Sequence, residues 1–438
     1  MASEHRGGSR GLGRGGYALL AAMTALSPLT NVFILPGLPE IAAALDTTLA
    51  AAQFALSVSF AGLAVGLLIV GPLSDAYGRR IPVTTGLVVY VVTTVLCAFA
   101  PDISLLVLGR FLQGVAGGAV WVIARAIVRD VFHARATARA FSQLAMITGL
   151  APVVAPIIAG QILLFTDWRG LIVALAIVGA AIATFTILFL RETLPPARRQ
   201  RTGFVGQLRT MGGLVRSPYF ATFFALGILQ STTHFTFVIM SPVVFHQDYG
   251  FTAQTFALLY AGAAGCMVIG NQTNALLVRR LSPVTLLRAL LWITVVGAIA
   301  FLAAILLRAP LPLVIAAMML IPLASGATNS NITALGLAPY PHAAGAAAAL
   351  LGASSSVIGA FVPPLVSLIS VGGVTMAVTM VGASIVALIL ALATHRRLRP
   401  VFAAALSDDP AESPGDVAVP VAGAAARVSA SRNVSAQE

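Results

Sequence analysis

Long uncharged apolar runs recur along this chain, and only short charged links separate them. Positions 49 to 70 form one such run and positions 81 to 101 form the next. A transmembrane helix needs about 20 consecutive, mainly apolar residues. Only 9% of all residues are charged, against roughly 25% in a typical soluble domain. The chain is therefore predicted to be an all-α integral membrane protein.

Twelve apolar segments are long enough to span a bilayer, and the longest interior polar segment divides them into two groups of six. The predicted spans are 17–38, 49–70, 81–99, 104–126, 140–165, 168–190, 219–245, 253–277, 284–307, 311–335, 343–369 and 373–394. The predicted units are a tail (1–16), an N-terminal six-helix bundle (17–190), a linker (191–218), a C-terminal six-helix bundle (219–395) and a disordered tail (396–438).

The arginines predict how the spans are oriented. All 26 basic residues are arginine, and loops rich in Arg stay on the cytoplasmic side. With both termini inside, the exterior links carry only Arg169 and Arg308, whereas 23 arginines lie in interior tails and links. We expect a multi-pass protein of the inner membrane with both termini in the cytoplasm. The net charge of +12 then needs no nucleic-acid partner, and the absence of lysine excludes a P-loop ATPase.

A charged turn is predicted between the second and third spans, from Gly71 to Arg80. Its Asp75 lies four residues before Arg79, so the carboxylate could hold that guanidinium or the end of a neighbouring helix. Gly71 and Gly78 allow a tight turn and close helix approach. Alternatively, the stretch is a simple anchor at the membrane surface.

The same pattern returns after the eighth span. From Gly270 to Arg280 the order is again a glycine, then Asn274 in the place of the acid, then the arginine pair Arg279 and Arg280. A repeat of a six-span unit is a known transporter architecture, with the substrate bound between the halves. The repeat therefore predicts two bundles with the same orientation around a central cavity.

Arg110 lies about seven residues inside the fourth predicted span, where a charge is costly and generally functional. Gln113 follows one helical turn later and shares its side of the helix. If the pair faces the interior, it contributes to the cavity. The alternative is that Arg110 snorkels to the nearer headgroups.

His234 lies at the same depth in the seventh span as Asn31 does in the first. Histidine ionises at an unperturbed pKa of about 6.5, which suits a proton carrier. Together with Gln230 and Phe235 it offers polar groups among aromatic rings, as a cavity for amphiphilic compounds needs. The competing interpretation is a histidine that only packs and forms hydrogen bonds.

The fifth span carries Gly149, Pro152, Pro156 and Gly160. The last three recur every four residues and so share one helix face. Prolines bend a helix and glycines allow close contact. An ordinary tightly packed transmembrane helix could show the same pattern.

These stretches together resemble the major facilitator superfamily, and in particular its drug exporters of the Bcr/CflA type. The resemblance extends from about Leu19 to Leu392, and its main motifs are Gly71 to Arg80, Leu106 to Gly114, Ala124 to Asp130 and Gly149 to Gly160.

The resemblance implies roles for several residues. It implies a cytoplasmic latch in which Asp75 approaches the start of the eleventh helix while Arg79 or Arg80 approaches Asp130. It further implies that the fifth span seals the exterior face and that Arg110 takes part in proton or substrate handling. The chain departs from the family at Asn31, where relatives generally carry an acid, and an amide cannot take up a proton near neutral pH.

The sequence thus predicts a secondary transporter with the major facilitator fold. Its expected function is export of an amphiphilic drug by alternating access, with Arg110 and His234 as candidates for proton coupling. The alternatives are export of an endogenous metabolite, such as an amino-acid derivative, and a weakly coupled facilitator. The histidines are scattered and no nucleophile motif is present, so we expect no enzyme, no cofactor and no metal. The expected partners are the bilayer, protons and a small molecule, and the expected state is a monomer.

Overall fold

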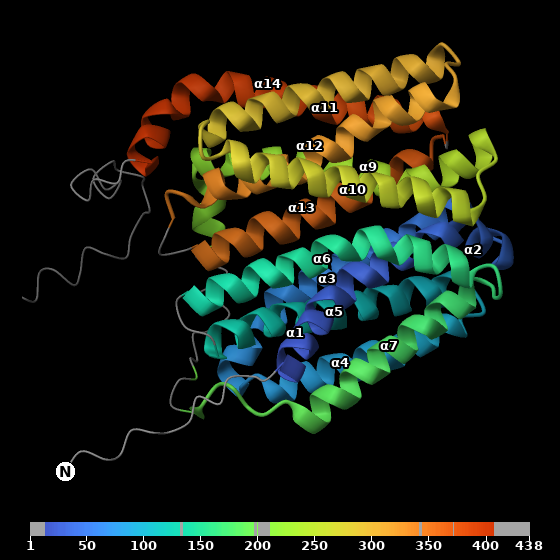
Figure 1. Ribbon diagram of the computed structural model, residues 1–438, viewed down its shortest axis with the longest axis vertical. Coiled ribbons are helices and arrows are strands. Elements are labelled where there is room, and N and C mark those ends of the chain that lie inside the picture. The colour runs from blue at the N-terminus through green and yellow to red at the C-terminus, as the bar shows by residue number, and fades with distance from the viewer. Residues whose placement is uncertain are drawn as a thin grey trace, which may run out of the picture.

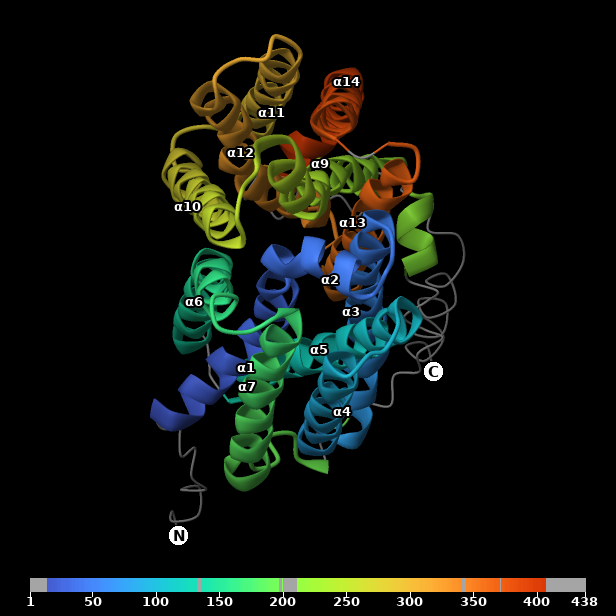
Figure 2. The ribbon, with the colours of Figure 1, turned by 90° about the vertical axis from the view of Figure 1, so that its right-hand side faces the viewer.

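The computed structural model describes residues 14–131, 135–196, 199, 211–340, 344–370 and 372–406. Most of the predicted linker and tails lies outside these residues. In the described part, twelve helices of at least 19 residues form two groups, one above the other in Figure 1 and again in Figure 2. The twelve-helix fold predicted from the apolar runs is therefore confirmed.

The N-terminal bundle consists of α1 (Arg14–Phe33), α3 (Leu49–Tyr77), α4 (Arg80–Ala98), α5 (Ile103–Val131), α6 (Arg135–Ile162) and α7 (Trp168–Phe189). A 3-10 turn, η1 (Leu35–Gly37), and the short α2 (Leu38–Ala44) join α1 to α3. The C-terminal bundle consists of α9 (Pro218–Tyr249), α10 (Ala253–Leu277), α11 (Pro283–Leu306), α12 (Leu311–Leu337), α13 (Ala344–Ser367) and α14 (Gly373–Leu406).

Ten candidate membrane spans are found among the described residues, and α6 adds the shorter apolar stretch Ile147–Ile162. The start of α1 and the end of α14 both lie toward the left in Figure 1. We call this side of the molecule the terminal end and the other side the opposite end.

The predicted charged turn is shorter than expected. Helix α3 continues through Pro72 and Asp75 to Tyr77, and α4 already begins at Arg80. A bilayer requires only about 20 helical residues, but helical hydrogen bonding continues beyond the bilayer until a residue leaves helical geometry. That residue is Gly78, whose φ of +97° favours glycine. Most of the stretch predicted as a turn is therefore helix.

Other helix ends also extend past the predicted spans. Helix α5 ends at Val131, so Asp130 is helical, and α14 continues to Leu406, beyond the predicted bundle end at 395. Cap residues mark several starts: the Thr48 side chain accepts a hydrogen bond from the backbone N–H of Ala51, and Asp167 caps α7 in the same way.

Helices α3 and α5 pack unusually closely. A methyl group added at Gly62 or Gly66 would fall inside van der Waals distance of a backbone carbonyl on α5. Reciprocally, a methyl group at Gly114 or Gly118 would overlap a carbonyl on α3. Small residues allow such close helix approach within membranes. The two helices are therefore held backbone to backbone, which makes them one rigid wall of the bundle.

The buried apolar core differs between the two ends. One large cluster joins the bundles, because it combines residues such as Leu35 and Leu171 with Phe245, Phe256 and Phe301. Two other clusters stay within one bundle each, one around Leu87 and Ile127 and one around Leu287 and Leu335. Among the described residues, the buried core that the bundles share thus lies at one end only.

Candidate functional site

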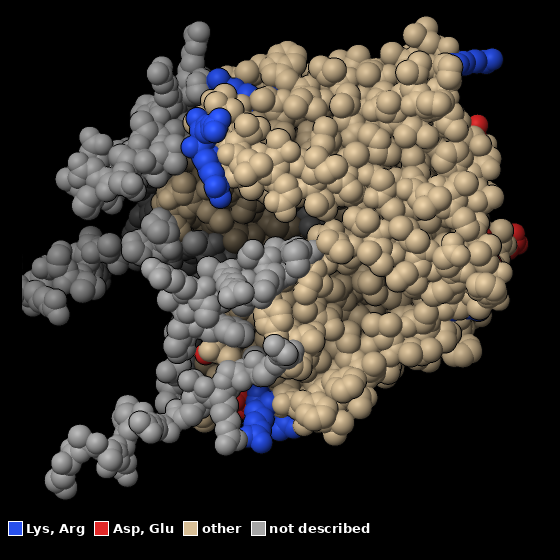
Figure 3. All heavy atoms as spheres, in the orientation of Figure 1, with Lys and Arg blue, Asp and Glu red and all other residues tan. Residues whose placement is uncertain are grey.

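A cavity of about 450 Å³ lies between the two bundles. Residues of both bundles line it: Ser27, Pro28, Asn31, Val32, Phe60, Leu63, Leu67, Trp121, Gly149, Pro152, His234, Phe235, Phe237, Val238, Tyr260, Ala263, Ala264, Met267, Pro322, Asn329 and Gly352. The lining is mostly apolar and aromatic with a few polar groups, as is usual for small-molecule sites. In Figure 3 the surface is hollowed between the two bundles on the side of the terminal end.

A buried arginine stands behind one wall of the cavity. Arg110 is 2% exposed, and its guanidinium donates to Gln113 Oε1 at 2.6 Å and to Asn31 Oδ1 at 3.1 Å. Ser59 Oγ donates to the same Asn31 oxygen at 2.6 Å. All these partners are neutral, and Arg110 Nε has no hydrogen-bond partner. The described part of the chain therefore provides Arg110 with hydrogen bonds but no counter-charge.

Three of the six predicted cavity residues line this cavity and three do not. Asn31, His234 and Phe235 line the cavity, whereas Arg110, Gln113 and Gln230 are not among its lining residues. The three are almost fully buried within their own bundles. Asn31 of α1, which accepts a hydrogen bond from Arg110, lines the cavity in its place, and Gln230 donates to Ser325 of α12.

His234 is one of the polar groups on the facing wall, with Asn329 of α12. Its Nδ1 lies 3.4 Å from Ser325 Oγ on α12, and Gln230 Nε2 donates to the same hydroxyl at 3.3 Å. Its ring meets the ring of Phe235 edge to face. Phe235 in turn packs on Phe60 across the bundle interface, with ring centroids 4.6 Å apart. No carboxylate takes part in this cluster.

Two glutamines connect the bundles beyond the cavity. Gln53 Nε2, in the first turns of α3, donates to the Ile239 carbonyl oxygen of α9 at 3.3 Å. Gln254 Nε2, in the first turn of α10, donates to the Gly160 carbonyl oxygen of α6 at 3.1 Å. Helices α3 and α10 occupy equivalent places in the two halves. The two bonds cross the bundle interface in opposite directions, from α3 to α9 and from α10 to α6, and we call them the glutamine clasp.

The residues of the fifth span fall at different depths of α6. Gly149 and Pro152 line the cavity, while Pro156 is buried. Gly160 lies against α10, where an added methyl group would be 3.1 Å from Ala257 Cβ. The residue also provides the carbonyl of the glutamine clasp. The glycine thus permits close contact between the bundles at this point.

Arg79 bridges two helices at the α3–α4 turn. It pairs with Asp75 at 2.6 Å and with Asp130 of α5 at 2.8 Å, and its Nη1 donates to Ser74 Oγ. Burial by itself would lower the pKa of Arg79, but the hydrogen bonds and charges of Asp130 and Asp75 outweigh it and raise the pKa. Asp75 thus pairs with Arg79, the first of the two partners that the sequence suggested for its carboxylate. Its predicted approach to the eleventh helix stays a prediction.

Glu192 completes this turn and was not singled out in the sequence. Its carboxylate accepts the backbone N–H of Arg79 at 2.8 Å and of Arg80 at 3.3 Å, as well as those of Thr193 and Leu194. Burial raises the pKa of this carboxyl, but the four backbone hydrogen bonds outweigh burial and the pKa is lowered. A methyl group at Gly78 would lie 2.5 Å from Glu192 Oε2. The segment after α7 therefore closes over the turn.

The second copy of the motif is built differently. Asn274 Oδ1 accepts a hydrogen bond from Asn331 Nδ2 of α12 at 2.8 Å, and Gly270 packs against the Leu323 carbonyl. Arg279 and Arg280 are exposed, and neither forms a salt bridge within the described residues. Because an amide replaces the acid, this turn has no charge to hold its arginines. The described part of the second half therefore has no ion pair that matches those of Arg79.

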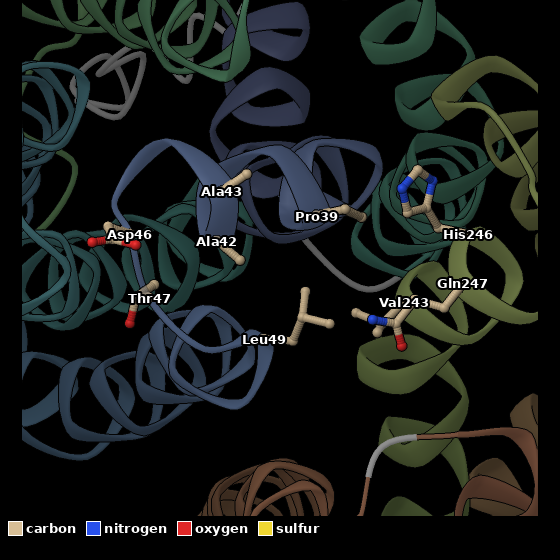
Figure 4. A pocket seen from close by; sticks show the side chains of 9 residues that line it. All are labelled: Pro39, Ala42, Ala43, Asp46, Thr47, Leu49, Val243, His246 and Gln247. Carbon is tan, nitrogen blue, oxygen red and sulfur yellow. The ribbon is translucent and has the colours of Figure 1, made fainter.

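A second cavity, of about 460 Å³, lies between α2 and the last turns of α9. Its lining includes Asp46, Thr47, His246 and Gln247, and Figure 4 shows these side chains around the gap between the two bundles. His246 Nδ1 lies 2.9 Å from the Phe251 carbonyl oxygen. The sequence analysis does not predict this cavity, because its residues come from two segments far apart in the chain, α2 with the start of α3 and the end of α9.

Comparison with known proteins agrees with this architecture. The sequence profile described as the Major Facilitator Superfamily matches residues 20–364. The chain belongs to this superfamily. It is therefore a membrane transporter and not an enzyme.

Two similar proteins are the uncharacterized MFS-type transporter YdgK of Bacillus subtilis and the multidrug resistance protein MdtL of Escherichia coli O157:H7. The first is 33% identical over 83% of this chain and 90% of its own length, and the second is 33% identical over 56% of this chain and 61% of its own.

Solved structures share the fold at low identity. The nucleoside transporter NupG superimposes with a TM-score of 0.70 at 13% identity, covering 86% of this chain and 99% of that one. The xylose transporter XylE of E. coli in a partially occluded, inward-open conformation gives 0.63, covering 86% and 96%. These similarities establish the major facilitator fold and leave the substrate to be argued from the cavity.

Proposed function

We propose that this protein exports an amphiphilic drug or antibiotic across the bacterial inner membrane by alternating access, in the manner of the Bcr/CflA-type exporters that its motifs resemble. The observation that carries the proposal is the cavity between the bundles, which is mostly apolar and lies beside a shared core at one end only. A relative named a multidrug resistance protein supports the drug as substrate class.

The arginines support an orientation with the terminal end in the cytoplasm. In Figure 3 basic side chains gather mainly at the terminal end, while acidic ones are visible at both ends. Arginine-rich loops remain cytoplasmic. Under this orientation both termini are cytoplasmic, the cavity opens inward, and the shared core and glutamine clasp close the exterior face.

The glutamine clasp would hold the exterior side closed in the inward-open state. Neutral hydrogen bonds contribute about 1 kcal/mol each, so replacing both Gln53 and Gln254 by leucine should shift the equilibrium about thirtyfold toward the outward-open state. Spin labels at positions 165 and 369, where Phe165 is 86% and Ile369 87% exposed, measure the opening between the bundles. We expect a larger population of long distances in the double variant.

The control for the clasp experiment is Gln161→Leu, since Gln161 is exposed on α6 and its side chain makes no hydrogen bond to the other bundle. Unchanged distance distributions in the double variant would contradict the gating role of the clasp.

We propose proton-coupled antiport. In this proposal His234 is the proton carrier, and Arg110 is a fixed positive charge that takes part in the coupling. His234 supports this because it lines the cavity and its only described hydrogen-bond partner is the hydroxyl of Ser325. In inverted membrane vesicles, His234→Gln should reduce the dependence of drug uptake on a pH gradient at least about tenfold. His246→Gln is the matched control, because that histidine lies outside this cavity. Full gradient dependence in His234→Gln would exclude the carrier role.

Export of an endogenous metabolite, such as an amino-acid derivative, is the second candidate, because the same fold carries both kinds of substrate. The function is tested by expression in a drug-sensitive host against an antibiotic panel, with and without collapse of the proton gradient. Raised resistance that disappears on collapse would support drug antiport. Resistance unaffected by collapse would favour a weakly coupled facilitator, and no change across the panel would favour the metabolite.

A further inference from the structure

The charges around the central cavity are of one sign. Its described lining residues include no Asp, Glu, Lys or Arg, and His234 is the one histidine among them. Two arginines stand directly behind lining residues: Arg110 donates to Asn31, and Arg125 lies 4.1 Å over the ring of Trp121. Neither of the two salt bridges in the described structure involves Arg110. The wall formed by α1 and α5 therefore presents a positive potential to the cavity.

Arg110 also determines what Asn31 can offer a ligand. A guanidinium has donors only, so the Asn31 oxygen must point toward Arg110 and Ser59, as it does here. The amide nitrogen then points the other way, and one of its two hydrogens goes to the Ser27 carbonyl oxygen at 3.2 Å. Because Asn31 lines the cavity, the group it can offer there is a hydrogen-bond donor.

A cationic ligand would find no compensation in this cavity. Desolvating a charge without a partner is costly, and the described walls provide no carboxylate. Aromatic rings attract cations by only about 0.5–2 kcal/mol, and the Trp121 ring already carries Arg125 on one face. An anionic group would instead accept from Asn31 and partly neutralise Arg110.

We propose that the central cavity selects anionic amphiphiles, such as an aromatic carboxylate, and rejects organic cations of the same shape. This inference rests on the proposed function, because it takes the cavity between the bundles as the substrate site. It narrows the substrate class by charge, and the apolar lining provides the site for the aromatic body.

The test compares three probes with the same ring system: 1-naphthaleneacetate, its methyl ester and 1-naphthylmethylammonium. Binding to the purified full-length protein is measured by isothermal titration calorimetry. We expect the carboxylate to bind at least about tenfold more tightly than the ammonium, with the ester between them. Equal or tighter binding of the ammonium, or no binding of the carboxylate, would overturn the proposal.

Asn31→Asp gives a second measurement. This change keeps the shape of the side chain, places a carboxylate on the cavity wall and pairs it with Arg110. We expect this variant to lose the preference for the carboxylate by about tenfold or more. The control is Asn329→Asp, which also places a carboxylate on the cavity wall but on the other bundle, whereas Arg110 donates to Asn31. Asn329→Asp should reduce the preference less. An unchanged preference in a folded Asn31→Asp protein would contradict the role of Arg110 and Asn31; if that variant does not fold, the comparison of the three probes with the wild type still decides.

The binding experiment tests the charge selectivity and the export assay tests the proposed function, and either result can be negative without the other. Selective binding of the carboxylate without drug resistance in cells would contradict export and leave the charge selectivity intact. Resistance to cationic drugs with tighter binding of the ammonium would support export and overturn the selectivity.

Discussion

Gly114→Ala is expected to abolish accumulation of the folded protein. The added methyl group would overlap the Ser59 carbonyl oxygen of α3, and the next neighbours are also backbone atoms. Neither helix can yield locally, because Gly62 and Gly118 fix the same contact above and below. Overpacking of a core typically costs about 1–3 kcal/mol, and a backbone overlap lies at the upper end of this range or beyond. The measurement is the monodisperse yield in detergent with the melting temperature.

Gly262→Ala is the matched control for this substitution. Gly262 lies in α10 and has nothing within 4 Å of the position of an added methyl group, so the yield should equal that of the wild type. A normal yield and melting temperature for Gly114→Ala would show that α3 and α5 are not in backbone contact.

Arg110→Gln is expected to abolish transport while the protein still inserts into the membrane. The substitution removes the donors to Asn31 and Gln113, so the buried Gln113 oxygen loses its partner and the Asn31 oxygen keeps only Ser59. Each unsatisfied group costs about 1–3 kcal/mol, and the positive potential behind the cavity wall is lost. The measurement is drug uptake in inverted vesicles, normalised to the amount of protein in the membrane, and we expect a reduction of at least about a hundredfold.

Arg308→Gln provides the control, since Arg308 lies in the short link between α11 and α12 and is exposed. Its uptake should match the wild type. Uptake by Arg110→Gln within about twofold of the wild type would show that the buried charge serves packing alone.

The two halves show where a sequence repeat does and does not predict structure. The Gly-to-Arg-Arg pattern correctly indicated that α3 and α10 are equivalent, and Gly270 does pack against a backbone carbonyl as the glycines of α3 do. The ion pairs do not repeat, because Asn274 forms an amide hydrogen bond where Asp75 holds Arg79. A pattern of residue types therefore predicted the helix positions better than it predicted the side-chain partners.

The cavity shows the same limit. Periodicity placed Arg110 and Gln113 on one face of α5, and that face is buried. It could not indicate that Asn31 on α1 would separate them from the cavity. Gln53 and Gln254 were missed although both stand in the first turns of equivalent helices, because each accepting carbonyl group belongs to a helix of the other bundle. Glu192 offered no such signal, because its partners are backbone N–H groups.

The sequence by itself determined that the chain lies in a bilayer, how many spans it has and which superfamily it resembles. The reason is that the length of an apolar run and the positions of the arginines can be read without knowing which residues meet in the fold. Only the tertiary structure decided which polar groups meet: the neutral shell around Arg110, the glutamine clasp and, within the part of the chain that the structure describes, the lack of an ion pair at Arg279 and Arg280. The physical reason is that a helix fixes the direction of each side chain about its own axis. The tilt and rotation of twelve helices against one another decide which of those directions converge.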